Sequence, residues 1–124
     1  MNRYAAFISY SHADAAHVAW LHNRLETYRM PRALVGTETA FGPLQRRLPP
    51  IFRDRDELPA SGDLGSELRS ALGAAESLIV VCSPAAARSR WVNEEILSFK
   101  RLHGENRVLA LIVAGEPGDG DNEC

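Results

Sequence analysis

The sequence predicts an α/β fold in which a parallel sheet carries helices on both faces. Apolar runs of strand length alternate with segments whose apolar residues recur at helical spacing. Two of the runs, residues 4–10 and 78–82, contain almost no polar residues, which is typical of strands covered on both faces. Strands and helices that alternate in this way, as β-α-β-α-β-α-β, indicate parallel strands joined by crossover helices.

Length and composition limit the classes of protein that fit. The 124 residues suffice for one domain with one core, and 45% of them are hydrophobic. The formal net charge of −2 argues against a nucleic-acid binder, although it leaves room for a local basic patch. Cys82 and Cys124 form no disulfide framework or metal-type pair, and the four histidines are scattered. The apolar segment at the N-terminus is too short for a signal peptide or a membrane span, so we expect a cytoplasmic, bacterial protein without membrane contact.

The first half of the chain contains two predicted strands, one helix and a long loop. The strand at residues 4–10 leads into a variant capping box, in which Ser11 is the cap and Asp14 stands where Glu is usual. Pro31 ends the helix, whose apolar stripe is Val18, Leu21, Leu25 and Tyr28. Residues 31–50 show no sustained period and predict a long loop, either functional or a tolerated surface insertion. The second strand is predicted at residues 50–53.

The second half repeats the alternation. A charged loop at residues 54–62 precedes a helix that Asp63 can cap, with a stripe of Leu64, Leu68, Leu72 and Ala75. The third strand is predicted at residues 78–82, and the third helix from about Ser89 to Leu102, where Gly104 stops it. The fourth strand, residues 107–113, is followed by a polar tail rich in turn residues.

The fourth strand is unusual because it is as apolar as a central strand, yet no element follows to cover it. An exposed apolar edge favours aggregation. Either the strand is central by topology, or the chain is a fragment that lacks the next strand and helices. We favour the fragment.

Four motifs, in the right order and on the right elements, resemble those of the Toll/interleukin receptor (TIR) domain family. Residues 7–11 resemble the family's first strand, and residues 53–62 resemble the end of its second strand and its mobile BB loop. Residues 78–84 resemble the third strand with its Ser-Pro exit. The fourth match is the helix motif, with Ser89, Trp91 and, four residues after the Trp, Glu95. Together these matches cover most of the chain from residue 4 to residue 113.

The resemblance implies a flavodoxin-like sheet of order 2-1-3-4-5, of which this chain supplies 2-1-3-4 and lacks the fifth strand. We therefore expect residues 1–124 to form a single TIR-like domain, truncated at its C-terminus, with a loop insertion at about 31–50. Two further departures from the family are Val92, where Cys is frequent, and the length of that insertion.

The resemblance also implies an activity and a catalytic residue. Some TIR domains are interaction modules, and others cleave NAD between nicotinamide and ribose. In the enzymatic ones the Glu four residues after the Trp is catalytic, which here is Glu95. Helical phase separates it from its neighbour independently: at about 100° per residue, Glu95 lies at the margin of the inward face and Glu94 points away. The alternative is that Glu95 only complements the helix dipole.

Further candidate residues lie at the carboxyl ends of the strands, where parallel α/β sheets bind their ligands. Trp91 is expected either to stack on a substrate or to anchor the core, and Arg53 either to meet a phosphate or to remain solvated. Around a nucleotide we also expect Phe7, Ser9, Tyr10, Ser11, Asp54, Leu58 and Ser83. For the residues that end the first strand, the alternative roles are core packing and helix capping.

These observations favour a TIR-domain NAD nucleosidase of cytosolic signalling or defence, with NAD as substrate and neither cofactor nor metal. We expect activation by self-association through surfaces that include residues 54–62, further domains in a longer parent protein, and no nucleic-acid partner. The alternative is a non-catalytic TIR module that signals through homotypic contacts. A P-loop and a dinucleotide fingerprint are both missing from the sequence, as are the acidic residues of a receiver domain.

Overall fold

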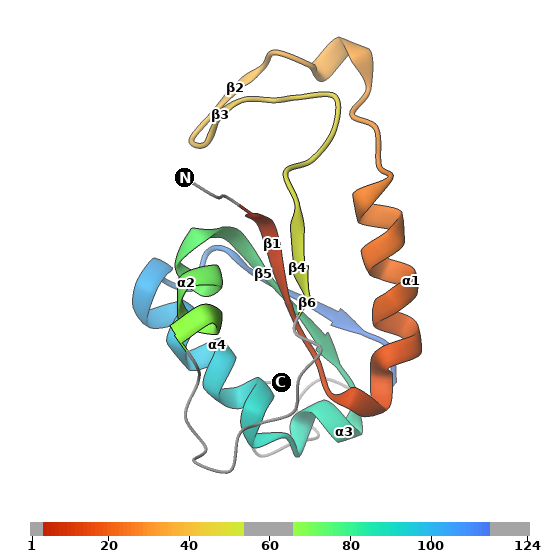
Figure 1. Ribbon diagram of the computed structural model, residues 1–124, viewed down its shortest axis with the longest axis vertical. Coiled ribbons are helices and arrows are strands. Elements are labelled where there is room, and N and C mark those ends of the chain that lie inside the picture. The colour runs from red at the N-terminus through yellow and green to blue at the C-terminus, as the bar shows by residue number, and fades with distance from the viewer. Residues whose placement is uncertain (1–3, 54–65, 115–124) are drawn as a thin grey trace.

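The computed structural model describes residues 4–53 and 66–114 and contains one four-stranded parallel sheet (Figure 1). Its strand order is β4-β1-β5-β6. The bounds are Tyr4–Ser9 for β1, Ile51–Arg53 for β4, Ala75–Cys82 for β5 and Val108–Ile112 for β6. Counted along the predicted strands this is the order 2-1-3-4, so the flavodoxin-like α/β fold is confirmed.

Helices cover both faces of the sheet (Figure 1). Helix α1, Ala15–Glu26, packs on one face, while α2, Ser66–Ala74, and α4, Arg90–His103, pack together on the other. A single helical turn that the sequence pattern did not predict, α3 at Pro84–Ala87, links β5 to α4. It is too short to show a helical period.

The core has two halves because side chains alternate along the central strands. Phe7 and Leu78 point toward α2 and α4, where they join Leu72, Val92 and Phe99. Ile8 and Val81 point the other way and pack with Val18 of α1. Strand β1 therefore carries residues of both halves, and its last residue, Ser9, follows Phe7 onto the α4 side.

Strand β6 lies at the edge of the described sheet, paired with β5 alone. Its side chains are largely exposed, with Leu109 at 55%, Leu111 at 40% and Ile112 at 45%. The four helices of the described residues leave these three side chains uncovered. The predicted edge position of this strand agrees with the structure.

The two ends of α1 differ from the prediction. Ser11 caps a 3₁₀ turn, His12–Asp14, by accepting a hydrogen bond from the backbone N–H of Ala13 at 3.3 Å. The side chain of Asp14 makes no capping bond, so the predicted capping box is wrong. The helix ends at Glu26 rather than near Pro31, since Thr27 turns its hydroxyl back onto the Asn23 carbonyl at 2.8 Å.

Residues 28–50, here called the arm, leave the compact part of the domain beyond the end of α1 (Figure 1). The arm contains a 3₁₀ turn, Arg32–Leu34, and a hairpin of two short strands, β2 at Glu38–Thr39 and β3 at Gly42–Pro43. The predicted loop therefore has local secondary structure. Its strands are only two residues long, so they are too short to give a periodic pattern in the sequence. Figure 1 shows the arm at the end of the sheet where β1 and β4 begin.

Candidate functional site

The candidate catalytic carboxylate lies in the second turn of α4. Ser89 starts this helix by accepting a hydrogen bond from the Val92 backbone N–H at 3.2 Å. Glu95 is only 1% exposed, whereas Glu94 beside it is half-buried. The helical phase thus separates the two carboxylates in the predicted direction, and Glu95 lies deeper than the predicted margin of the inward face.

Ser9 holds Glu95 from the end of the central strand. Its hydroxyl donates to Oε1 of Glu95 at 2.7 Å, and both side chains are buried. A buried carboxylate requires such a donor, because the water that solvates it elsewhere is excluded. Ser9 was predicted to bind substrate, and the structure shows that its hydroxyl donates to the carboxylate of Glu95.

Two aromatic candidates, Trp91 and Phe7, pack in the core beside the carboxylate. Trp91 is 9% exposed and belongs to the same apolar cluster as Phe7 and Phe99. The ring of Phe7 stacks on Phe52 with 4.9 Å between centroids. In this arrangement both residues belong to the apolar core and present little or no surface to solvent.

A second buried carboxylate lies at the same sheet edge. Asp14 follows β1, Ser83 follows β5, and the Ser83 hydroxyl donates to Oδ2 of Asp14 at 2.5 Å. Ser83 also accepts from the Ala86 backbone N–H at 3.0 Å, so it caps α3. Ser83 was among the predicted site residues, whereas Asp14 was predicted to complete a helix cap. The proximity of Asp14 and Ser83 could have been predicted from the pairing of β1 with β5, because residues that follow adjacent parallel strands lie close together.

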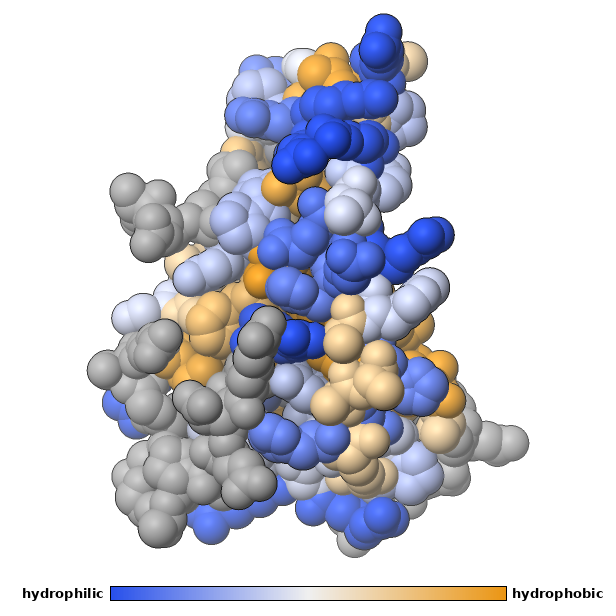
Figure 2. Space-filling view, turned by 45° about the vertical axis from the view of Figure 1, so that its right-hand side comes forward, coloured by the Kyte–Doolittle hydropathy of each residue, from blue (hydrophilic) through white to orange (hydrophobic). Residues whose placement is uncertain are grey.

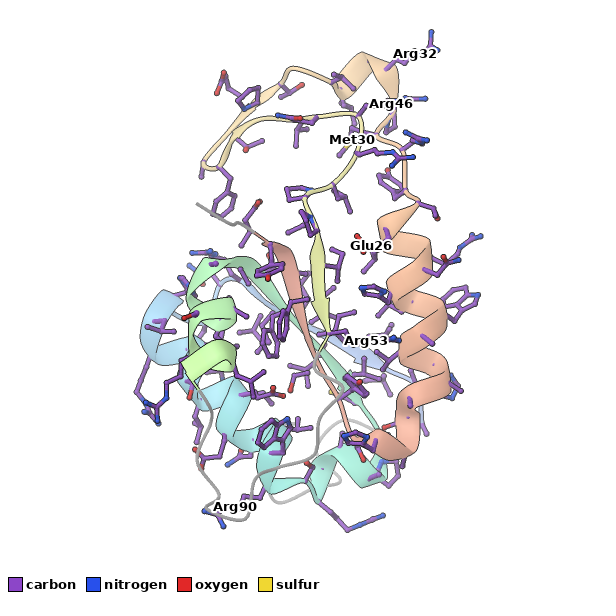
Figure 3. The ribbon with its side chains drawn as sticks, viewed as in Figure 1. Glu26, Met30, Arg32, Arg46, Arg53 and Arg90 are labelled. Carbon is purple, nitrogen blue, oxygen red and sulfur yellow. The ribbon has the colours of Figure 1, made fainter. Side chains whose placement is uncertain are left out.

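The other candidates lie on the α1 side of the sheet, in the turn after β1, or in the loop outside the described residues. Tyr10 is buried in the cluster on the α1 side, and Ser11 caps the 3₁₀ turn. Arg53 ends β4, and Figure 3 shows its side chain reaching toward α1. Its Nε is buried and has no hydrogen-bond partner among the described residues. Asp54 and Leu58 lie outside the described residues, as does the rest of the loop at 54–62.

The part of the chain that the structure describes contains no grouping of three or more histidine, cysteine or acidic side chains that could hold a metal ion. Within the same residues, none of the helices has the length and apolar character needed to cross a membrane.

Fold and site together define a flavodoxin-like α/β domain with two buried carboxylates at the carboxyl edge of its sheet. A family model described as TIR domain matches residues 6–122. The chain therefore belongs to the TIR domain family, as its motifs predicted.

The chain is also similar to one curated protein and to one solved structure. The chain is 34% identical over 119 residues to NAD(+) hydrolase ApTIR of Actinoplanes sp. (strain ATCC 31044 / CBS 674.73 / SE50/110), a match that covers 92% of this chain. The chain spans only 14% of the length of that curated relative. It also matches the TIR domains of the activated Roq1 resistosome directly recognizing the pathogen effector XopQ, with a TM-score of 0.54 and 25% identity. That match covers 90% of this chain and 57% of the other.

Proposed function

We propose that this domain cleaves NAD at the bond between nicotinamide and ribose, with Glu95 as the catalytic residue. The observation that carries the proposal is the geometry of Glu95, a buried carboxylate that Ser9 orients at the ligand-binding edge of the sheet. Similarity to a protein named as an NAD(+) hydrolase supports the same chemistry.

The proposed chemistry suits a carboxylate that water does not reach. When the bond breaks, its electron pair leaves with the nicotinamide nitrogen, and positive charge develops on the ribose. A carboxylate stabilises that charge, as it does for sugars in glycosidases, and the stabilisation is stronger where water is excluded. Nicotinamide departs as a neutral molecule, so its departure needs no second acid. The hydrogen bond from Ser9 keeps the carboxylate from rotating away.

We further propose that contacts between copies of the domain switch this activity on, in cytoplasmic signalling or defence. The similar TIR domains are those of a protein described as an activated resistosome. Residues 54–62, which lie outside the described part of the chain, are one proposed contact.

A TIR interaction module without turnover is the second candidate function. One observation favours it: the Ser9 hydroxyl donates to Oε1 of Glu95 inside the domain, as it would in a purely structural pair. Both functions require the same fold, so only a measurement of turnover separates them.

Substitution of the two adjacent glutamates tests the proposal. We expect Glu95→Gln, which keeps the size of the side chain and an oxygen for Ser9, to lower NAD cleavage by on the order of 10²–10³-fold. Glu94→Gln is the matched control and should retain most of the activity. Chromatography of free nicotinamide released from NAD measures both variants, and thermal unfolding verifies that both are folded. A folded Glu95→Gln variant with wild-type turnover would falsify the enzymatic proposal.

A further inference from the structure

We propose that Asp14 is a second substrate-binding residue, which accepts hydrogen bonds from the ribose hydroxyls in the adenosine half of NAD. This inference rests on the proposed function and deepens it, because it assigns a residue to the other end of the same substrate. It also predicts that the domain distinguishes NAD from NADP, which carries a phosphate on that ribose.

Asp14 is a buried carboxylate with one oxygen available to a ligand. It is 8% exposed and lies in the 3₁₀ turn between β1 and α1. The Ser83 hydroxyl donates to its Oδ2 at 2.5 Å, and that hydroxyl is itself held by the Ala86 backbone N–H. Within the described residues, Asp14 forms no ion pair and its Oδ1 accepts no hydrogen bond. Because a carboxylate removed from water requires donors, Oδ1 is suited to accept one from a ligand.

The pair of Asp14 and Ser83 lies where flavodoxin-like sheets bind their ligands. In the order β4-β1-β5-β6, the chain passes from β1 outward to β4 and then returns to β5 on the other side of β1. The strand order therefore reverses between β1 and β5, and ligands bind outside the carboxyl ends of the strands at such a reversal. Asp14 follows β1 and Ser83 directly follows β5, so their hydrogen bond spans the reversal.

The two buried carboxylates belong to elements on opposite faces of the sheet. Glu95 is part of α4, whereas Asp14 leads into α1, which packs on the other face. NAD contains two riboses joined by a diphosphate, and ribose hydroxyls are donors that acidic residues accept in dinucleotide-binding folds. A dinucleotide across the end of β1 therefore brings one ribose to each carboxylate. With the nicotinamide ribose at Glu95, the adenosine ribose lies at Asp14.

The residues beside Asp14 in the chain leave room for a sugar. Ala13, Ala15 and Ala16 are exposed, and their methyl groups are too small to enclose the carboxylate. Figure 2 shows weakly hydrophobic side chains on the lower part of the face that α1 presents, below a strongly hydrophilic upper part. Apolar surface beside a few well-placed polar groups is typical of small-molecule sites, in which the polar groups fix the orientation of the ligand.

A carboxylate at the adenosine ribose selects against NADP. The 2′-phosphate of NADP replaces a hydroxyl donor with negative charge, so Asp14 would lose a hydrogen bond and meet a like charge. In dinucleotide-binding folds an acidic residue takes the ribose hydroxyl of NAD, whereas an arginine accommodates the phosphate of NADP. We therefore expect this chain to favour the unphosphorylated ribose by at least about tenfold in affinity.

Calorimetric titration of the purified chain tests the proposal without any turnover. The probes are ADP-ribose and its 2′-phosphate, which retain the adenosine ribose of NAD and of NADP and contain no nicotinamide. Asp14→Asn keeps the size of the side chain and an oxygen for Ser83. We expect it to weaken the binding of ADP-ribose by about tenfold and to reduce the preference between the probes to within about threefold.

Glu26→Gln is the matched control, because it removes the same charge from the far end of α1. It should change neither the affinity for ADP-ribose nor the preference between the probes. Thermal unfolding verifies that both variants are folded. Nicotinamide release from NAD and from NADP is measured on the same samples.

Each outcome decides the proposal. A chain that does not bind ADP-ribose overturns it, and so does an Asp14→Asn variant that keeps the wild-type preference. Equal weakening of both probes also overturns it, because a purely structural Asp14 would affect both alike. Tighter binding of the 2′-phosphate by the wild-type chain overturns it and points to a cation such as Arg53 at this ribose. A preference that depends on Asp14, in a chain that releases no nicotinamide, supports this inference and contradicts only the proposed chemistry.

Discussion

One hydroxyl group decides how the candidate catalytic carboxylate is held. Ser9 and Glu95 are 86 residues apart in sequence, and their hydrogen bond joins the end of β1 to the second turn of α4. We propose that Ser9 acts on the reaction through Glu95, because its hydroxyl donates to the carboxylate. It is therefore a positioning residue in the proposed site.

We expect Ser9→Ala to lower kcat for NAD cleavage more than it changes KM. The substitution leaves Oε1 of a buried carboxylate without its donor, which should also cost about 1–3 kcal/mol of unfolding free energy. Steady-state kinetics and urea denaturation measure the two effects. Ser77→Ala, at a half-buried serine of neighbouring β5, is the control and should change both little. If KM alone rises, Ser9 contacts the substrate, as the sequence first suggested.

At the residue scale, the sequence predicted that Glu95 lies closer to the core than Glu94. It did not predict the hydrogen-bond partner of the Glu95 side chain. The inward face of a helix follows from local spacing, so Glu95 could be separated from Glu94 before the structure was known. The role of Ser9 depends on which helix covers the end of β1, and spacing along one strand carries no such information. Asp14 was assigned to a cap for the same reason, since Ser83 reaches it from another strand.

At the scale of elements, the pair of Asp14 and Ser83 fastens the start of α1 to the junction between β5 and α3. Ser83 accepts from the Ala86 N–H while its own hydroxyl donates to Asp14, so one side chain serves two elements. This junction lies at the same sheet edge as Glu95. Its order should therefore affect both the stability of the domain and the shape of the site.

A double-mutant cycle measures this junction. We expect Asp14→Ala to cost about 1–3 kcal/mol of unfolding free energy, and Ser83→Ala about 1 kcal/mol more because the α3 cap is lost as well. Their coupling should be about 0.5–3 kcal/mol, as is usual for residues in contact. Urea denaturation gives all four corners of the cycle. Strictly additive losses would mean that the two side chains do not interact in solution. Ser11→Ala, which removes the exposed cap of the 3₁₀ turn, should cost less.

The sequence predicted long elements better than short ones. Helix α4 begins and ends within one residue of its predicted limits, because Ser89 and Gly104 mark its ends and its apolar stripe is long. Helix α1 stops early, at Thr27, where the Thr27 hydroxyl donates a hydrogen bond to the Asn23 carbonyl. This side-chain bond competes with the backbone hydrogen bonds of the helix, and the spacing of apolar residues does not reveal it. The hairpin of the arm and the single turn of α3 are too short to produce a period.

At the scale of the whole molecule, a sheet with a core on each face determines the stability of the domain. Phe99 is fully buried between α4 and the sheet, whereas Leu109 of β6 is mostly exposed. The alternation of strands and helices was sufficient to predict this layered arrangement, and the resemblance to TIR domains implied its strand order. It could not place the arm, whose direction depends on the bend after α1 and on the contact of Phe41 with Arg107.

We expect Phe99→Ala to destabilise the domain by about 3–5 kcal/mol through loss of buried apolar contacts and creation of a cavity. Leu109→Ala should cost less than about 1 kcal/mol, because most of that side chain already meets solvent. Thermal and urea unfolding at low protein concentration compare the two variants. Equal losses would show that β6 is covered in solution, by a segment or a second copy that packs against it.

All four strands run in the same direction, which gives the domain two unlike poles. The group proposed for chemistry lies at one pole, and the insertion at residues 28–50 lies at the other. Selection can then act on the two poles separately. Substitutions in residues 28–50 therefore leave the surroundings of the carboxylate and its serine unchanged.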